Sequence, residues 1–441
     1  MIVSISNTGR AGASALGVLI VVAGVLLAFA GPAQAISRSC AWQLQATADE
    51  TNIAYPDQHA AYWLSDLPIP SGGHIEIEAQ YPHARYTSLI TYNAQSQAID
   101  GIHDTQIKPN PGSRNPFLAG ANRNAAHRSY TVQIVNQRIP ASGRAQNTLY
   151  TENADGSKST KNESLASFML RIYVPNRGDE IDGGVPLPSV SVVSSSGQKT
   201  TFPDCPDVIP DTGVNETLAA SGSGAAFPGL PVSATPAWHK YTNLATHQAT
   251  IYGAGTPIPG AVTPTTDQAI GSGGFWENVD NKYIYTQMDQ TLGQVLVLHA
   301  KAPTTPRTLE GEKRMGTGQL RYWSICSNNP QTTQFYGCAY DEQVPVDKHG
   351  YYTFVISTAA ARPSNATLAC GIAWLPAGPL ARTELIMRNM LPAPGFKRAI
   401  QNARVGHEQQ DLGAYYPTGR YYASALGFER NGCSRPAGSG R

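Results

Sequence analysis

Hydrophobic and polar residues alternate in several short segments of this chain, and that alternation predicts β-strands. In the segment 73–81, Ile75, Ile77, Ala79 and Tyr81 are apolar, and the residues between them are polar. The segment 168–174 alternates between two faces as well, with Arg171 on the second face. A period of two places successive side chains on opposite faces of a strand. The first segment therefore predicts a strand with one wet face.

Two further strands are predicted at 85–92 and 129–136, in runs rich in Thr, Tyr, Val and Ile, which favour pleated structure. Segments later in the chain that repeat the earlier ones predict strands at 294–302, 320–326, 349–357 and 387–392. The segment 395–404 is the exception, because Phe396, Ile400 and Ala403 recur at helical spacing. It predicts a short helix near the C-terminus.

Two of these segments repeat one another. Both 85–106 and 321–343 open with Arg-Tyr-x-Ser and an apolar residue, and Asn93, Gly101 and Gln106 match Asn329, Gly337 and Gln343. The segment 127–135 is answered by 349–357, and 170–175 is answered by 387–392, with Arg171 over Arg388. Matches that keep their order in several separate segments indicate a tandem duplication. The predicted fold class is all-β, with two tandem β-sandwich domains and a short C-terminal helix.

The expected domain boundaries follow from the N-terminal segment and from the duplication. Residues 1–35 carry an apolar run and an Ala33-Gln34-Ala35 cleavage motif, which predict a secretory signal peptide, with a membrane anchor as the alternative interpretation. After signal removal we expect no transmembrane span. Residues 36–205 form domain 1, residues 206–272 form a Pro/Gly-rich linker, and residues 273–441 form domain 2.

One difference between the copies predicts a packing contact. Val295 and Val297 occupy the positions at which the first copy has the polar residues His74 and Glu76. A strand that is apolar on both faces is covered on both faces. We expect the helix at 395–404 to be that cover, because the first copy lacks it.

Several motifs resemble the domain-of-unknown-function 1214 family, which often accompanies family 1254. They are the Arg321–Ser324 run, the Ala-Trp-Leu-Pro run at 373–376, and the segments 170–175 and 385–392. Ala373 stands where the family has asparagine. The chain also looks like a group of uncharacterised secreted actinobacterial proteins. The resemblance implies a jelly-roll-like β-sandwich and implies no chemistry.

Charge and cysteine content narrow the classes of function. The chain has 32 Lys and Arg against 31 Asp and Glu, so no basic surface for nucleic acid is expected. Six cysteines in an exported chain predict disulfides, whereas zinc would need closely paired cysteines that do not occur. Sequence alone permits fifteen pairings. Position along the chain favours Cys40–Cys205, Cys326–Cys338 and Cys370–Cys433.

A small group of polar residues provides candidates for catalysis. Asp100, His103 and Asp104 cluster in the first copy, and Asp341 and Glu342 lie in the corresponding loop of the second. Carboxylates beside a histidine can act as acid and base. The alternative is a solvated turn with capping aspartates. No serine-hydrolase elbow, zinc-protease motif or phosphate-binding loop is present.

Aromatic and arginine residues on or beside strands are the candidates for ligand binding: Tyr92, Arg171, Tyr322, Trp323 and Arg388. Exposed in a cleft, aromatic rings would stack on sugars or hold apolar ligands. Residues that both copies keep are explained most simply by the fold, and most of the aromatic residues by a position in the core.

The function expected from the sequence is an exported protein that binds a glycan or lipid of the cell envelope. One alternative is an extracellular hydrolase using the acidic loops, and another is a structural or interaction protein of the envelope. Whether the protein is an enzyme stays open. We expect no cofactor, no metal and no nucleic-acid partner.

Overall fold

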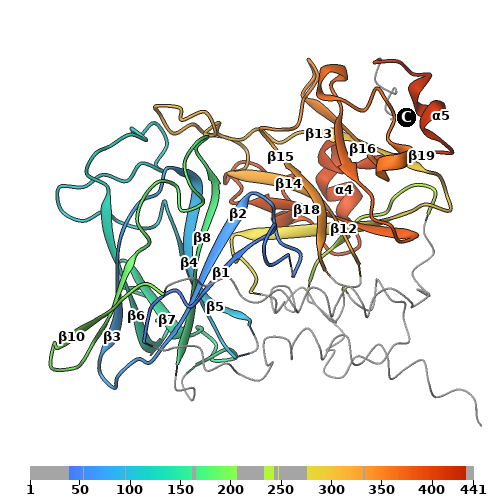
Figure 1. Cartoon of the computed structure of the whole chain (residues 1–441). Coiled ribbons are helices and arrows are strands. Elements are labelled where there is room, and N and C mark those ends of the chain that lie inside the picture. The colour runs from blue at the N-terminus through green and yellow to red at the C-terminus, as the bar shows by residue number, and fades with distance from the viewer. Residues whose placement is uncertain are drawn as a thin grey trace, which may run out of the picture.

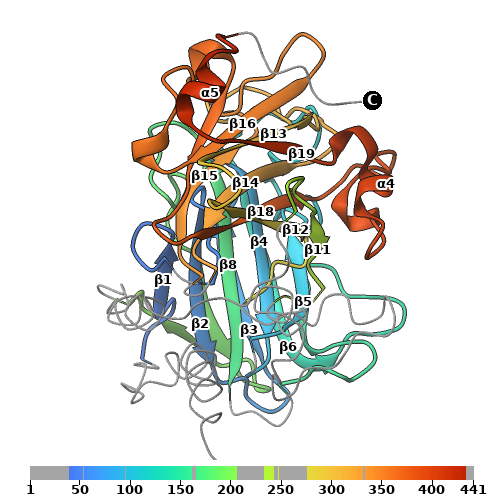
Figure 2. The same ribbon diagram turned by 90° about the vertical axis from the view of Figure 1, so that its right-hand side faces the viewer.

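The computed structural model describes residues 39–52, 54–94, 96–160, 165–205, 233–242, 247, 276–330 and 333–433. The described chain is mostly β-structure, as the alternating pattern predicted, and its strands form four sheets. Figures 1 and 2 show the first two sheets in blue and green beside the last two in yellow and red. The predicted signal peptide and most of the predicted linker lie outside the described residues, so both stay predictions.

The first half contains two five-stranded sheets. One has the order β1-β2-β8-β4-β5, built from Leu44–Thr47, Ala60–Leu67, Ala166–Pro175, Ala84–Tyr92 and Ala98–His103. The other has the order β10-β9-β3-β6-β7, built from Lys199–Phe202, Ser189–Val193, His74–Gln80, Ser129–Arg138 and Thr148–Glu152. Apolar side chains such as Ile75, Ile77, Leu170 and Ile172 fill the core that the two sheets share.

The second half repeats this arrangement. Its first sheet has the order β11-β12-β18-β14-β15, built from His239–Lys240, Asn281–Asp289, Arg382–Met390, Tyr322–Asn328 and Phe335–Tyr340. Its second sheet has the order β17-β16-β13-β19, built from Ala373–Pro376, Tyr351–Ser357, Val295–Lys301 and Thr418–Tyr422. Leu296 and Leu298 lie in its core, at the positions predicted to match Ile75 and Ile77.

Strand order and register agree between the halves. Ser88 pairs with Arg171 on β4 and β8, and Ser324 pairs with Arg388 on β14 and β18. Even the unusual parallel pairs correspond, because β6 runs parallel to β7 and β16 runs parallel to β17. A strand order shared in this way is what the duplication predicted.

The register corrects one detail of the repeat. Ile90 pairs with Gly101, and the equivalent Cys326 pairs with Cys338. Gly101 therefore corresponds to Cys338, and not to Gly337 as expected. The second copy has its extra residue earlier than expected, in the turn between β14 and β15, where an insertion does not disturb the pairing of the strands.

The predicted helix at 395–404 is wrong. That segment holds only a 3₁₀ turn, Ile400–Asn402, although Phe396, Ile400 and Ala403 do pack into the core of the second half. The two short α-helices near the C-terminus are α4, Glu408–Leu412, and α5, Ala425–Glu429. Further 3₁₀ turns are Ala359–Ala361, Leu368–Cys370 and Gly413–Tyr415.

The strand β13 is covered on both faces as expected, and Val295 and Val297 are buried at 0% and 4% exposure. Their cover is different from the expected one. Phe428 of α5 packs on them together with Val355 and Ile372, whereas Phe396 and Ile400 lie in the core on the other side of the sheet. Apolar spacing located the buried face of 395–404 but could not decide which side of the sheet it packs on.

Three disulfides join Cys40 to Cys205, Cys326 to Cys338, and Cys370 to Cys433, the pairs that position favoured. Such bonds are typical of proteins from oxidising compartments. Within the described ranges, no helix is long and apolar enough to cross a membrane.

Candidate functional site

The two halves meet through equivalent sheets, and the contact is reciprocal. Arg85 of the first half forms ion pairs with Asp341, at 2.9 Å, and with Glu342 of the second half. Arg321, the equivalent arginine, forms an ion pair at 3.0 Å with Asp104, the residue equivalent to Asp341. Each arginine also donates to the other's backbone carbonyl, at 3.3 and 3.1 Å. Such exchanged contacts are the signature of a two-fold interface.

Tyrosines continue this reciprocity toward the middle of the interface. The Tyr322 hydroxyl donates to Asp57 of the first half at 2.8 Å. The Tyr86 hydroxyl reaches Asn278, at 3.2 Å, and Asp280, at 2.7 Å, in the second half. The Arg-Tyr-x-Ser repeat therefore holds the two halves together through its first two residues.

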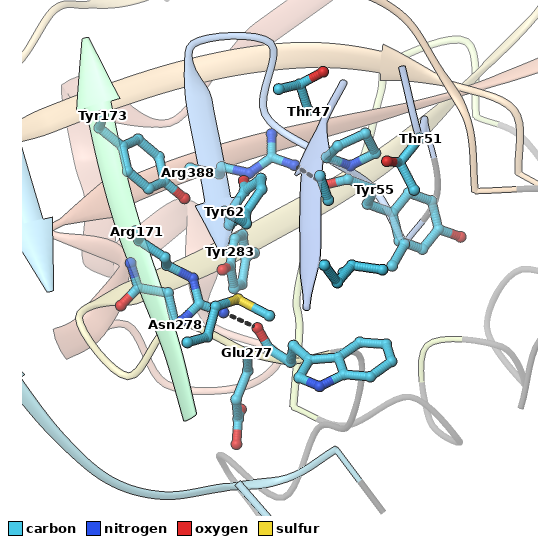
Figure 3. A pocket seen from close by; sticks show the side chains of 16 residues that line it. Thr47, Thr51, Tyr55, Tyr62, Arg171, Tyr173, Glu277, Asn278, Tyr283 and Arg388 are labelled. Carbon is cyan, nitrogen blue, oxygen red and sulfur yellow. Dashed lines mark hydrogen bonds between the residues drawn. The ribbon is translucent and has the colours of Figure 1, made fainter. Parts of the chain in front are cut away.

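A cavity of about 120 Å³ lies between the facing sheets. Figure 3 shows side chains from both halves pointing into it. Its walls are mainly aromatic and apolar, and two arginines enter it. The lining includes Tyr55, Tyr62, Arg171, Tyr173, Trp276, Glu277, Asn278, Tyr283 and Arg388.

The two arginines have equivalent surroundings. Arg171 donates to the Trp276 carbonyl and lies 5.6 Å from the centre of the Tyr62 ring. Arg388 donates to the Tyr55 carbonyl at 2.5 Å and lies 5.7 Å from the centre of the Tyr283 ring. Both guanidinium groups are held over aromatic faces, where a cation is attracted by the ring electrons.

The tyrosines around the cavity are neutral. Burial raises the pKa of Tyr62, of Tyr173 and of Tyr283 above the usual range. Each ring therefore offers an apolar face and a hydroxyl group that can donate or accept a hydrogen bond. The cavity can hold a ligand by stacking and by hydrogen bonds at the same time.

A second cavity of about 70 Å³ adjoins the first and shares Tyr55, Tyr283 and Arg388 with it. His247 lines this cavity, and its Nε2 lies 2.5 Å from Oε1 of the buried Glu384. The Tyr241 and Tyr285 rings pack against the imidazole, and His247 Nδ1 has no hydrogen-bond partner among the described residues. A carboxylate that holds one imidazole nitrogen while the other is free is an arrangement suited to accepting a proton.

The structure does not bring the predicted catalytic residues together in a cleft. Asp104, Asp341 and Glu342 hold the interface arginines, and burial raises the pKa of Asp104 and of Asp341. Asp100 binds Arg144 through both carboxylate oxygens, at 2.9 and 2.7 Å.

His103 has no carboxylate partner in a salt bridge within the described ranges, and its imidazole contacts the Thr105 hydroxyl at 3.1 Å. Burial lowers the pKa of His103. Like the four acidic candidates, it does not line either of the two cavities.

The predicted ligand-binding residues divide into three groups. Arg171 and Arg388 line the cavity. Tyr92 does not line the cavity but holds two residues that do, because its hydroxyl contacts Arg171 and donates to the Glu277 carbonyl at 2.9 Å. Tyr322 belongs to the interface, and Trp323 lies in the core of the second half.

Sequence reasoning did not single out Tyr55, Asn278 or His247. A weak signal for the first two does exist in the repeat. The segments 55–62 and 276–283 each begin with an aromatic residue, carry Asp or Asn at the third position and end in tyrosine. His247 has no such counterpart that we recognise.

One cluster has metal-ligand chemistry but cannot use it. Asp57, Cys326 and Cys338 bring ligand atoms within 4.8 Å of one another. The two cysteines are joined in a disulfide, so they offer no thiolate for a metal. We assign no metal site to the described residues.

No protein-family model matches the chain, and no curated protein matches it. Two solved structures are similar in outline. An uncharacterised protein from Burkholderia cenocepacia has a TM-score of 0.46 and 11% identity over 86% of each chain. A protein from Vibrio parahaemolyticus has a TM-score of 0.42 and 12% identity over 92% of this chain and 98% of that one.

Proposed function

We propose that this chain is an exported binding protein whose ligand, a glycan or lipid of the cell envelope, occupies the cavity between the two halves. The observation that supports the proposal is the cavity itself, in which aromatic rings surround two buried arginines. Sites for small ligands are concave, largely apolar and supplied with a few polar groups that fix orientation. Export is supported by the three disulfides.

The size of the cavity limits the ligand. One water needs roughly 10–15 Å³ of such volume, so a cavity of about 120 Å³ has room for a group of about ten heavy atoms. That corresponds to one sugar ring or to a short acyl chain. The adjoining cavity of about 70 Å³ extends the available space past Tyr283.

A hydrolase is the second candidate, and the observation that favours it is the His247–Glu384 pair beside the same space. It would use these two residues in place of the acidic loops, whose carboxylates are taken up by arginines. If the protein is a hydrolase, a bound ligand is cleaved over time and His247→Gln stops the cleavage. If the ligand is recovered intact after long incubation with the wild-type chain, the hydrolase proposal is wrong.

Native mass spectrometry of the secreted, disulfide-bonded chain tests the binding proposal. We expect a retained small molecule or, after its removal, reloading from a cell-envelope extract. Ala46 lies on β1 and lines the cavity, so Ala46→Phe fills part of it and should prevent loading. Thr200→Phe, on the exposed edge strand β10, is the matched control and should load normally. Equal loading of the Ala46→Phe and wild-type chains would place the ligand elsewhere and refute the proposal.

A further inference from the structure

The two equivalent arginines differ in one respect. Arg388 has a buried carboxylate close by, because its Nε lies 3.8 Å from Oδ2 of Asp57. Arg171 forms no salt bridge within the described ranges, although only 2% of its surface is exposed. An isolated buried charge is costly unless something pairs with it.

The duplication explains where the missing carboxylate would be. The backbone N–H of Ala60 donates to the backbone carbonyl of Asp57, and the equivalent N–H of Asn281 donates to the backbone carbonyl of Asn278. Ala60 and Asn281 are equivalent because they pair with Tyr173 and Met390, the partners of Tyr86 and Tyr322. Asn278 therefore occupies the position of Asp57, and a neutral amide stands where the other arginine has a carboxylate.

The Asn278 amide is itself incomplete. Its Oδ1 accepts from the Asp280 N–H at 3.0 Å, but its Nδ2 is buried and has no hydrogen-bond partner in the part of the chain that the structure describes. The residue is 3% exposed and lines the same cavity as Arg171. Figure 3 shows both side chains among those that line the cavity. A buried amide donor without an acceptor is expensive, so an acceptor at this place would be stabilising.

The neighbouring carboxylates do not fill this role. Glu277 lies 3.6 Å from Lys158 Nζ, and Asp280 accepts the Tyr86 hydroxyl at 2.7 Å. Within the described ranges neither forms a salt bridge with Arg171, although the Arg171 charge opposes the rise that burial causes in the pKa of Asp280. Glu277 lines the cavity as well, so negative charge is present nearby. Among the described residues, Arg171 lacks a carboxylate in ion-pair contact and the Asn278 Nδ2 lacks a hydrogen-bond acceptor.

We propose that the ligand is an anion whose carboxylate, phosphate or sulfate oxygens are bound by the Arg171 guanidinium and the Asn278 amide. This inference rests on the proposed function and names the ligand's charged group. Arginine has five N–H donors, of which two contact Tyr92 and Trp276. The remaining donors suit an oxyanion, and the low dielectric of a buried site strengthens the attraction. Tyr62 and Tyr283 then face the uncharged body of the ligand.

Calorimetric titration with matched probes tests the inference and separates the two sources of the anion. Glucuronate and glucose 6-phosphate are compared with glucose, and octanoate is compared with octan-1-ol. We expect the anionic member of one series to bind at least tenfold more tightly than its neutral partner. A preference in the sugar series identifies an acidic glycan, and a preference in the octyl series identifies an acyl chain.

Asn278→Asp is the decisive variant, because it restores the carboxylate of the other half without changing side-chain size. It keeps the acceptor for Asp280 and supplies Arg171 with an internal partner. We expect it to reduce anion affinity at least tenfold and to leave any binding of the neutral partner unchanged. Arg171→Gln should lose the same preference. Arg138→Gln, an exposed arginine in an ion pair with Glu152, is the control and should match the wild type.

The outcomes distinguish the inference from the proposed function. If neutral probes bind as tightly as their anionic partners, or if Asn278→Asp keeps the preference, the anion site is refuted while ligand binding stands. If no probe binds the wild-type chain at millimolar concentration, both are refuted. Thermal unfolding of each variant tests whether its fold is intact. If the Arg171→Gln chain does not fold, the result for Asn278→Asp decides.

Discussion

Replacing Arg85 by leucine removes the cation from a deeply buried ion-pair cluster between the halves. The Arg85 side chain is 0% exposed, and its partners Asp341 and Glu342 are 3% and 4% exposed. Loss of one partner from a buried pair leaves uncompensated charge and typically costs about 3–5 kcal/mol. We expect a loss of that size in the free energy of unfolding at neutral pH.

The duplication supplies an internal control for this variant. Arg321 makes the equivalent contact, but its side chain is 13% exposed and it pairs with the single carboxylate of Asp104. A hydrogen bond to a charged group typically contributes about 1.5–3 kcal/mol, so Arg321→Leu should cost less than Arg85→Leu. The two variants remove the same chemical group from equivalent strands, so the difference reports burial and partner number.

Equilibrium unfolding in urea measures both losses, and coincident circular dichroism and fluorescence transitions establish whether the halves unfold together. The deficit of Arg85→Leu should shrink at mildly acidic pH. Burial already raises the pKa of Asp341, Arg85 opposes that rise, and without Arg85 the carboxyl takes up its proton more readily. A cost below about 1 kcal/mol for Arg85→Leu, or a larger cost for Arg321→Leu, would contradict this account of the interface.

Three further predictions concern single groups. Burial raises the pKa of Asp280, so the folded state binds this proton more tightly than the unfolded state does. Stability should therefore fall as the pH rises from about 4 toward neutrality, and Asp280→Asn should reduce that pH dependence in thermal unfolding. Phe428→Ala should cost about 3–5 kcal/mol by opening the cover over Val297, and no measurable loss in urea unfolding would show that α5 does not provide that cover. Replacing Cys40 and Cys205, which are 165 residues apart, should lower the free energy of unfolding by about 5 kcal/mol through loop entropy. Replacing Cys326 and Cys338, which are 12 residues apart, should lower it by about 3 kcal/mol. If urea unfolding gives the reverse ranking, loop entropy is not the main contribution.

The β-structure could be predicted from sequence because both its signals are local. Alternation located β3 and β8, and repetition located their counterparts β13 and β18. The segment 395–404 shows where local reasoning ends. Its apolar spacing is real and its apolar residues are buried, but a single 3₁₀ turn presents them as well as a helix would. Periodicity identifies a buried face more reliably than it identifies the backbone that carries it.

The site could be predicted only in part. Arg171 and Arg388 were identified as candidates, but their presence in both copies favoured a structural role. The acidic loops resembled a catalytic cluster in the sequence, yet Asp104 and Asp341 each form an ion pair with an arginine of the opposite half. Those contacts join residues more than two hundred positions apart and depend on how the halves face each other. No pattern within one copy contains that information.

The reciprocal interface also explains why a functional difference between the copies is concentrated at its centre. Along a two-fold axis, equivalent residues from both halves meet in one place, so a repeat that stayed identical would build a symmetric site with two paired arginines. The exchange of a carboxylate at Asp57 for an amide at Asn278 leaves one arginine paired and the other available. On the proposed function, this single substitution in one copy would convert a structural contact into a binding group. Arg85, Arg321 and their carboxylates keep the halves in register around it.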